Sequence, residues 1–300
     1  MTSQSQATFT PSAPTARPPS APILRFHDLD PEARFGLPTG KGTTPSSLTS
    51  FILALVVGAV FYGTAYALRG EPWGAAVWHY TTGFGQIPIP IVFLSIWSLV
   101  FLLVKSLKIR AQKQALRLSF VPEDSGFVLT DATADAVIDA IDRSVDDPSR
   151  FLFLARCRAV LRMMRNLGRV SDVDEVLSSR GDQDESSMDS GYTLLRGFVW
   201  AIPVLGFIGT VIGLTQAMGR FGDVMKVAGT DVGQITEKLR TVLEGLDTAF
   251  ITTAEALIAV LVIHLLQTAV RRADEALCDD IRAACSNAVV ARVRIARKEP

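Results

Sequence analysis

Three hydroxyls and one carboxylate stand out in this chain because they lie inside stretches that are otherwise apolar. Thr210 falls within the uncharged residues 201–214, and Thr252, Thr253 and Glu255 lie close together in a second apolar stretch. A threonine hydroxyl in a membrane helix either bonds back to a carbonyl of its own helix or offers an uncharged oxygen to a polar partner. A carboxylate near mid-membrane costs roughly 2.5–3.5 kcal/mol, so it rarely faces lipid. Glu255 is therefore either an ion-path or gating carboxylate or one half of an inter-subunit hydrogen bond.

The helix around Thr210 carries small residues on one side. Gly206, Thr210 and Gly213 are spaced by four and three residues, which places them on one helix face, and Gly209 adds an overlapping spacing. In lipid, such a face lets another helix approach closely. We predict that Gly206, Gly209 and Gly213 pack against protein. Pro203 either kinks the third span, where it could act as a hinge, or sits in the first turns of that span.

Four apolar segments must position these residues. The chain has 300 residues, of which 48% are hydrophobic, and a formal net charge of +0. The segments span residues 51–68, 87–104, 197–219 and 248–270. Each is close to the roughly 20 residues that cross a ~30 Å hydrocarbon core. The predicted fold class is therefore all-α: a polytopic membrane protein with four transmembrane helices and a helical cytoplasmic extension.

Basic residues near the ends of these segments set the predicted orientation. Five Lys or Arg residues follow the second segment and two follow the fourth, whereas the loop at 69–86 contains one. Because Lys and Arg accumulate on the cytoplasmic side of a membrane, we predict that both termini are cytoplasmic. The loop at 69–86 and the segment at 220–246 then face the outer side.

The composition divides the chain into five parts. The N-terminal part is rich in Pro, Ser, Thr and Ala, which is typical of disorder. The polar run that begins at Arg180 is predicted to be a loop before the third span. The five predicted parts are a disordered tail (1–47), transmembrane helices 1 and 2 (48–106), a cytoplasmic helical segment (107–192), transmembrane helices 3 and 4 (193–272) and a cytoplasmic C-terminal helix (273–300).

Several function classes have no support in the sequence. We find no nucleotide-binding loop, metal-ligand cluster or nucleophile constellation, so we predict neither an enzyme nor a bound cofactor or metal. No strongly basic domain is present, which argues against nucleic-acid binding. The three cysteines, Cys157, Cys278 and Cys285, lie in segments expected to be cytosolic, where thiols stay reduced.

The last two spans together resemble a known membrane-protein family. The run from Ile202, Ile-Pro-Val-Leu-Gly-Phe-Ile-Gly-Thr-Val-Ile-Gly, is similar to the Pro-x-Leu-Gly-x-x-Gly-Thr-Val-x-Gly segment of the MotA/TolQ/ExbB proton-channel family. The run from Ala249, Ala-Phe-Ile-Thr-Thr-Ala-Glu-Ala-Leu, resembles that family's Ala-Leu-x-Thr-Thr-Ala-x-Gly-Leu segment. The order of the two motifs and the preceding helical cytosolic segment also match.

The resemblance implies a stator subunit in a bacterial inner membrane. Family members form a homo-oligomeric ring, usually a pentamer, around the helices of two copies of a MotB/TolR/ExbD-like single-span partner. Ions cross at that interface, and the ion-binding aspartate belongs to the partner. By the motif alignment, the pore-facing threonines of the family correspond to Thr210 and Thr253, with Thr252 and Glu255 beside them.

The chain departs from the family pattern in its fourth span. Ala256 stands where the family has glycine, and the family's later Ala-Ile-Pro is missing. A second alignment register, through Ala-Glu-Ala-Leu, would place Val260 where the pore threonine belongs. The first register is preferred because it also matches the threonine pair.

The residues and the resemblance together support two hypotheses for the function. The first is an ion-conducting stator subunit, with the proton as the expected ion, that couples an ion gradient across the inner membrane to mechanical work. The alternative is a non-conducting membrane scaffold with the same helix packing, of which the missing Ala-Ile-Pro would be one symptom. Threonine hydroxyls serve H⁺ and Na⁺ equally, so the residues themselves do not select the ion.

Overall fold

The computed structural model is a bundle of helices. It describes residues 24–34, 36, 38–40, 42–118, 120, 129, 131–163, 170–227 and 232–292. Four of its helices are long and apolar enough to cross a membrane, which confirms the predicted fold class. The expected disorder of residues 1–23 lies outside the described residues. An isolated parallel β-bridge joins Leu24 to Val145.

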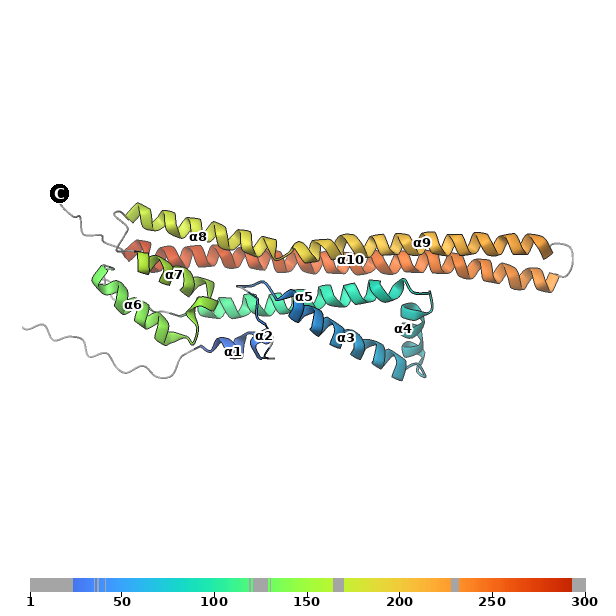
Figure 1. Cartoon of the computed structure of the whole chain (residues 1–300), viewed down its shortest axis with the longest axis horizontal. Helices are drawn as coiled ribbons and strands as arrows, with labels where there is room; N and C mark the ends of the chain where they lie inside the picture. Colours follow the sequence, from blue (N-terminus) through green and yellow to red (C-terminus); the bar gives the residue numbers. More distant parts are fainter. Residues whose placement is uncertain are drawn as a thin grey trace, which may run out of the picture.

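A long antiparallel hairpin of α9 (Thr193–Val227) and α10 (Val232–Ala288) dominates the molecule. The two helices lie side by side over their whole common length (Figure 1). The 57 residues of α10 rise by about 85 Å. This length exceeds a ~30 Å hydrocarbon core, so α10 extends beyond the apolar segment at both ends.

Two further apolar helices and a short connecting helix cover one side of the hairpin. They are α3 (Ser47–Ala67), α4 (Pro72–Thr82) and α5 (Pro88–Ala115). Both α4 and α5 begin with proline at the first helical position, where its missing N–H costs nothing. Helix α5 packs on α9 and α10, while α3 diverges from α5 and α4 closes the open end (Figure 1).

The part predicted to be cytoplasmic is a helical cluster around the ends of α5 and α10 that lie away from α4. Its elements are α6 (Asp131–Ser144), the 3-10 turn η1 (Pro148–Arg150), α7 (Leu152–Met163), α8 (Val170–Ser190) and the 3-10 turn η3 (Val290–Arg292). A continuous apolar core joins them. Helices α8 and α9 follow one another along α10 (Figure 1).

The polar run that begins at Arg180 is helical, so the prediction of a loop there is wrong. It forms the second half of α8. Its acidic side chains are paired across the cluster: Arg156 Nη2 lies 2.7 Å from Asp184 Oδ2, and Arg282 Nη2 lies 2.7 Å from Glu185 Oε2. These ion pairs to other elements hold the second half of α8 in place, since its sequence has no apolar face of its own.

The described residues between 24 and 46 fold against the bundle, whereas the sequence predicted disorder for the whole tail. They contain α1 (Phe26–Leu29) and α2 (Pro31–Arg34). The buried Glu32 carboxylate accepts the backbone N–H groups of Gly40 at 2.9 Å and Ser46 at 2.8 Å. It also lies 2.5 Å from Lys108 Nζ. A buried cation on α5 therefore fixes this segment.

A second buried ion pair lies one helical turn from Lys108. Lys105 Nζ is 2.8 Å from Asp274 Oδ2, and the two residues are 0% and 3% exposed. The Tyr192 hydroxyl lies 3.4 Å from the same oxygen, and Thr43 Oγ1 lies 3.4 Å from Lys105 Nζ. This cluster ties the N-terminal segment, α5, the α8–α9 junction and α10 together at the end of the spans away from α4.

Candidate functional site

The structure brings Thr210 of α9 and Thr253 of α10 into direct contact. Their Oγ1 atoms are hydrogen-bonded to each other. Thr253 Oγ1 also lies 3.0 Å from the Gly206 carbonyl and 3.1 Å from the Ala249 carbonyl. Thr210 Oγ1 is 3.2 Å from the Gly206 carbonyl and 3.3 Å from the Ala249 carbonyl. Two hydroxyls and two carbonyls from both helices therefore form one polar cluster.

The two hydroxyls of this cluster can accept further hydrogen bonds. Each hydroxyl carries one proton and two lone pairs, so the two threonines share two protons among one hydroxyl–hydroxyl contact and four contacts to carbonyl oxygens. Both side chains are partly exposed. The cluster can hydrogen-bond to water or to a protonated carboxyl group, but it carries no charge of its own.

Close approach of the two helices positions the threonines. Gly206 and Gly213 both lie at the contact between α9 and α10. A Cβ atom on Gly206 would come within 2.7 Å of Ala256 Cβ. A Cβ atom on Gly213 would come within 2.6 Å of the Gly245 oxygen and 2.7 Å of the Ala249 nitrogen. Because backbone atoms cannot move aside as a side-chain end does, Gly213 sets the helix separation beside the site.

We expect Gly213→Ala to destabilise the hairpin by about 1–3 kcal/mol, the usual cost of overpacking. Gly219→Ala on the same helix is the matched control, since nothing lies within 4 Å of the added atom. At that exposed position alanine should be neutral or stabilising because of its helix propensity. Thermal unfolding of both variants in detergent measures the difference. Equal melting temperatures would refute the close-contact role of Gly213.

Thr252 is turned away from the threonine pair. It is fully buried, and its hydroxyl lies 2.9 Å from the carbonyl of Thr248 and 3.3 Å from that of Ala249. The Cβ of an alanine at Gly209 would overlap the Thr252 hydroxyl. Gly209 thus makes room for Thr252 between the helices.

Glu255 lies on the other side of α10 from Thr253, because two residues turn a helix by roughly 200°. Its Oε2 atom is buried and has no hydrogen-bond partner among the described residues. The Tyr62 hydroxyl on α3 is within electrostatic range of this carboxylate and is likewise buried without a described partner. Sequence reasoning did not single out Tyr62, although it is a phenol within a charge-free span.

The structure also places Pro203 and Val260, which the sequence analysis singled out. Pro203 lies inside α9 rather than in its first turn, and the helix continues through it. Val260, the pore position in the second alignment register, packs against the apolar cluster of α5, α9 and α10. Because Thr253 rather than Val260 contacts Thr210, the geometry favours the first register.

One comparison with known proteins identifies a domain. The model of the MotA/TolQ/ExbB proton channel family matches residues 146–283. The match covers the elements from η1 through α8 and nearly all of the hairpin, including both threonines. No curated protein and no solved structure matches the chain. Family members are non-enzymatic membrane transport components of the bacterial inner membrane, with MotB/TolR/ExbD-type partners.

Proposed function

We propose that this chain, which carries a MotA/TolQ/ExbB proton channel family domain over residues 146–283, is the ring-forming subunit of an ion-driven stator. Copies of the chain, five by analogy with the family, enclose the helices of a dimeric single-span partner. The ion, a proton in the first instance, passes beside Thr210 and Thr253. The observation that carries the proposal is the contact between these two hydroxyls inside an apolar hairpin.

In this proposal the threonine pair lines the ion path with neutral hydroxyls and contributes no charge that would bind the ion. A neutral hydroxyl pair stabilises a protonated or hydrated carboxyl group beside it without holding the ion permanently. The carboxylate must then come from the partner, because Glu255 lies on the other side of α10 from Thr253. Alternation of the partner's aspartate between its charged and neutral forms would drive its movement past successive threonine pairs.

The surface of the hairpin supports assembly within a membrane. Large apolar side chains of α9 and α10 are exposed at the depth of the threonines, among them Phe207, Val211, Phe250 and Ile258. Lipid or neighbouring copies of the chain must cover them, since a face of this kind is unfavourable in water. We infer the orientation with both termini in the cytoplasm from the basic residues at the span ends.

The driving force is adequate for mechanical work. One elementary charge that crosses 100 mV releases about 2.3 kcal/mol. The helical cluster of α6, α7 and α8 gives the hairpin a fixed base against which this free energy moves the partner. Because the sequence offers no nucleotide-binding loop, the membrane gradient is the energy source in this proposal.

Ion flux through reconstituted complexes tests this function. We reconstitute the chain with a single-span MotB/TolR/ExbD-type partner in liposomes. The lumen should acidify when an inside-negative membrane potential is applied. An aspartate-to-asparagine change in the partner's span should stop this acidification. Replacing the proton gradient by a Na⁺ gradient identifies the ion. A complex that assembles with the partner but conducts neither ion would favour the non-conducting scaffold.

A further inference from the structure

A cavity of about 640 Å³ lies at the end of the bundle where α4 stands, outside the threonine site. The turn between α4 and α5 lines one side of it, and the neighbouring parts of α9 and α10 line the other. A cavity of this size is large enough to hold water. Both α4 and the turn precede residues 146–283, so this wall is built from a part of the chain that the family model does not cover.

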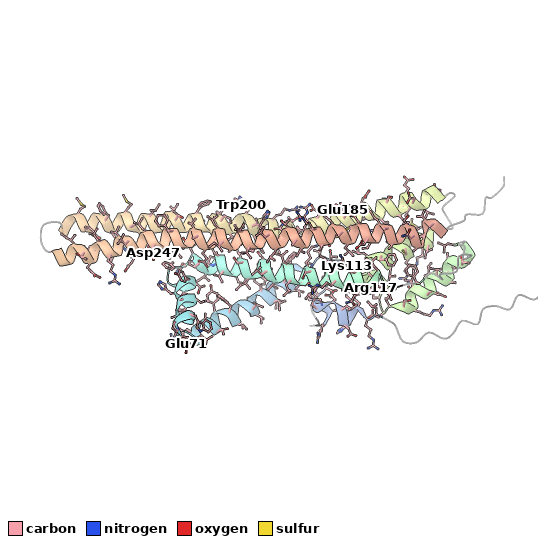
Figure 2. The ribbon with its side chains drawn as sticks, turned by 180° about the vertical axis from the view of Figure 1, so that it is seen from behind. Glu71, Lys113, Arg117, Glu185, Trp200 and Asp247 are labelled. Carbon is pink, nitrogen blue, oxygen red and sulfur yellow. The ribbon has the colours of Figure 1, made fainter. Side chains whose placement is uncertain are left out.

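The lining of the cavity mixes polar and apolar side chains, and its Arg, Glu and Asp residues carry an unbalanced negative charge. Within the wall formed by α9 and α10, Arg220 and Glu244 form an ion pair, with 3.7 Å between Nη1 and Oε2. The side chain of Asp247, which is exposed at the cavity, has neither a hydrogen bond nor an ion pair within the part of the chain that the structure describes. Figure 2 places Asp247 on α10 at the end of the bundle where α4 stands. A cleft with one excess carboxylate attracts cations.

The floor of the cavity reaches the threonines. Gly209 lines the cavity, and the Thr252 hydroxyl occupies the space that a Cβ atom on Gly209 would need. Thr252 shares the Ala249 carbonyl with both Thr210 and Thr253. Gly209 also immediately precedes Thr210 in α9. The buried Thr252 side chain therefore lies between Gly209 at the cavity and the Ala249 carbonyl that the threonine pair contacts.

We propose that this cavity is the outer aqueous route by which a small monovalent cation reaches the threonine pair from behind the hairpin. The cation, hydronium or hydrated Na⁺, collects at Asp247 and passes Thr252. This inference rests on the proposed function, and it adds an access path on the side of the hairpin that faces α4 and α5. Because Gly209 has no side chain, little protein separates the cavity from the threonine pair at this point. Any side chain at position 209 would close the route.

Neighbouring cysteine substitutions test whether water fills the cavity. Ile212 lines it, whereas Val211, 64% exposed on α9, is not part of its lining. Ile212→Cys and the matched control Val211→Cys are treated in open membrane fragments with a cationic methanethiosulfonate and with its anionic counterpart. The adduct is measured by mass spectrometry. The native cysteines are buried, so the wild-type chain gives the background.

We expect rapid labelling of Ile212→Cys, several-fold faster with the cationic reagent, and little labelling of Val211→Cys. Asp247→Asn should reduce the preference for the cationic reagent. Labelling should also stop ion flux in the reconstituted complex. Gln216→Cys, on the same wall, repeats the measurement if Ile212→Cys misfolds.

Absence of labelling at both cavity positions, or equal labelling of Val211→Cys, would overturn the aqueous cavity. Labelling that leaves ion flux unchanged would overturn the access route while the stator function stands. A complex that conducts no ion before any labelling refutes the proposed function itself, so the two failures are distinguishable.

Discussion

Thr210→Val should abolish ion-driven work while leaving the complex assembled. Valine has nearly the same shape as threonine but lacks the hydroxyl that faces Thr253. No carbonyl loses its last partner, because Thr253 Oγ1 still lies 3.0 Å from the Gly206 oxygen and 3.1 Å from the Ala249 oxygen. Stability should therefore change by less than about 1 kcal/mol, within the range of a single net hydrogen bond. Flux in liposomes and the amount of purified complex together measure the effect.

Thr215→Val and Thr210→Ser are the matched controls for that substitution. Thr210→Ser keeps the hydroxyl and should retain flux. Thr215→Val removes an exposed hydroxyl on α9 that bonds within its own helix, so it separates a general loss of polarity from a loss at the pair. Wild-type flux in Thr210→Val would remove Thr210 from the mechanism, and loss of assembly would reassign it to helix packing.

Lys105→Met should destabilise the chain by about 3–5 kcal/mol, because it leaves a buried carboxylate without its cation. Asp274 is 3% exposed, and its Oδ1 atom already has no hydrogen-bond partner among the described residues. For a chain of this size we expect the melting temperature to fall by on the order of 10 °C. Thermal unfolding of the purified chain in detergent measures it.

The double variant Lys105→Met with Asp274→Leu provides the control. Replacement of both charges by apolar groups of similar size is often neutral, so the double variant should regain much of the lost stability. Lys113→Met, at an exposed position on the same helix, should melt as the wild type does; Lys113 lies on the half of α5 away from α4 (Figure 2). A wild-type melting temperature for Lys105→Met would show that the buried pair does not hold this end of the bundle together.

The parts that the sequence predicted well depend on local patterns. Four apolar segments of membrane length are visible without any partner, because lipid requires each span to satisfy its own backbone. Thr210 and the glycines around it were also found from spacing, since residues three and four apart share a helix face. The contact of Thr210 with Thr253 then follows from the close approach that those glycines allow.

The parts that the sequence did not predict depend on pairs of residues far apart in the chain. Lys105 and Lys108 belong to a basic cluster that predicts only a cytoplasmic boundary, yet both are buried against carboxylates of other segments. Glu32 lies in a stretch whose composition is typical of a disordered tail. The contact of Glu32 with Lys108 on α5 orders this stretch, and nothing in the sequence around Glu32 indicates that contact. The acidic second half of α8 is held by Arg156 and Arg282 in the same way.

The mass of the intact complex tests the central claim most directly. The chain is co-expressed with a single-span MotB/TolR/ExbD-type protein, extracted in mild detergent and measured by native mass spectrometry. A ring of five copies of this chain with two copies of the partner is the result that the stator proposal requires. A monomer or a closed dimer that contains no partner would contradict the proposal and leave a four-span scaffold.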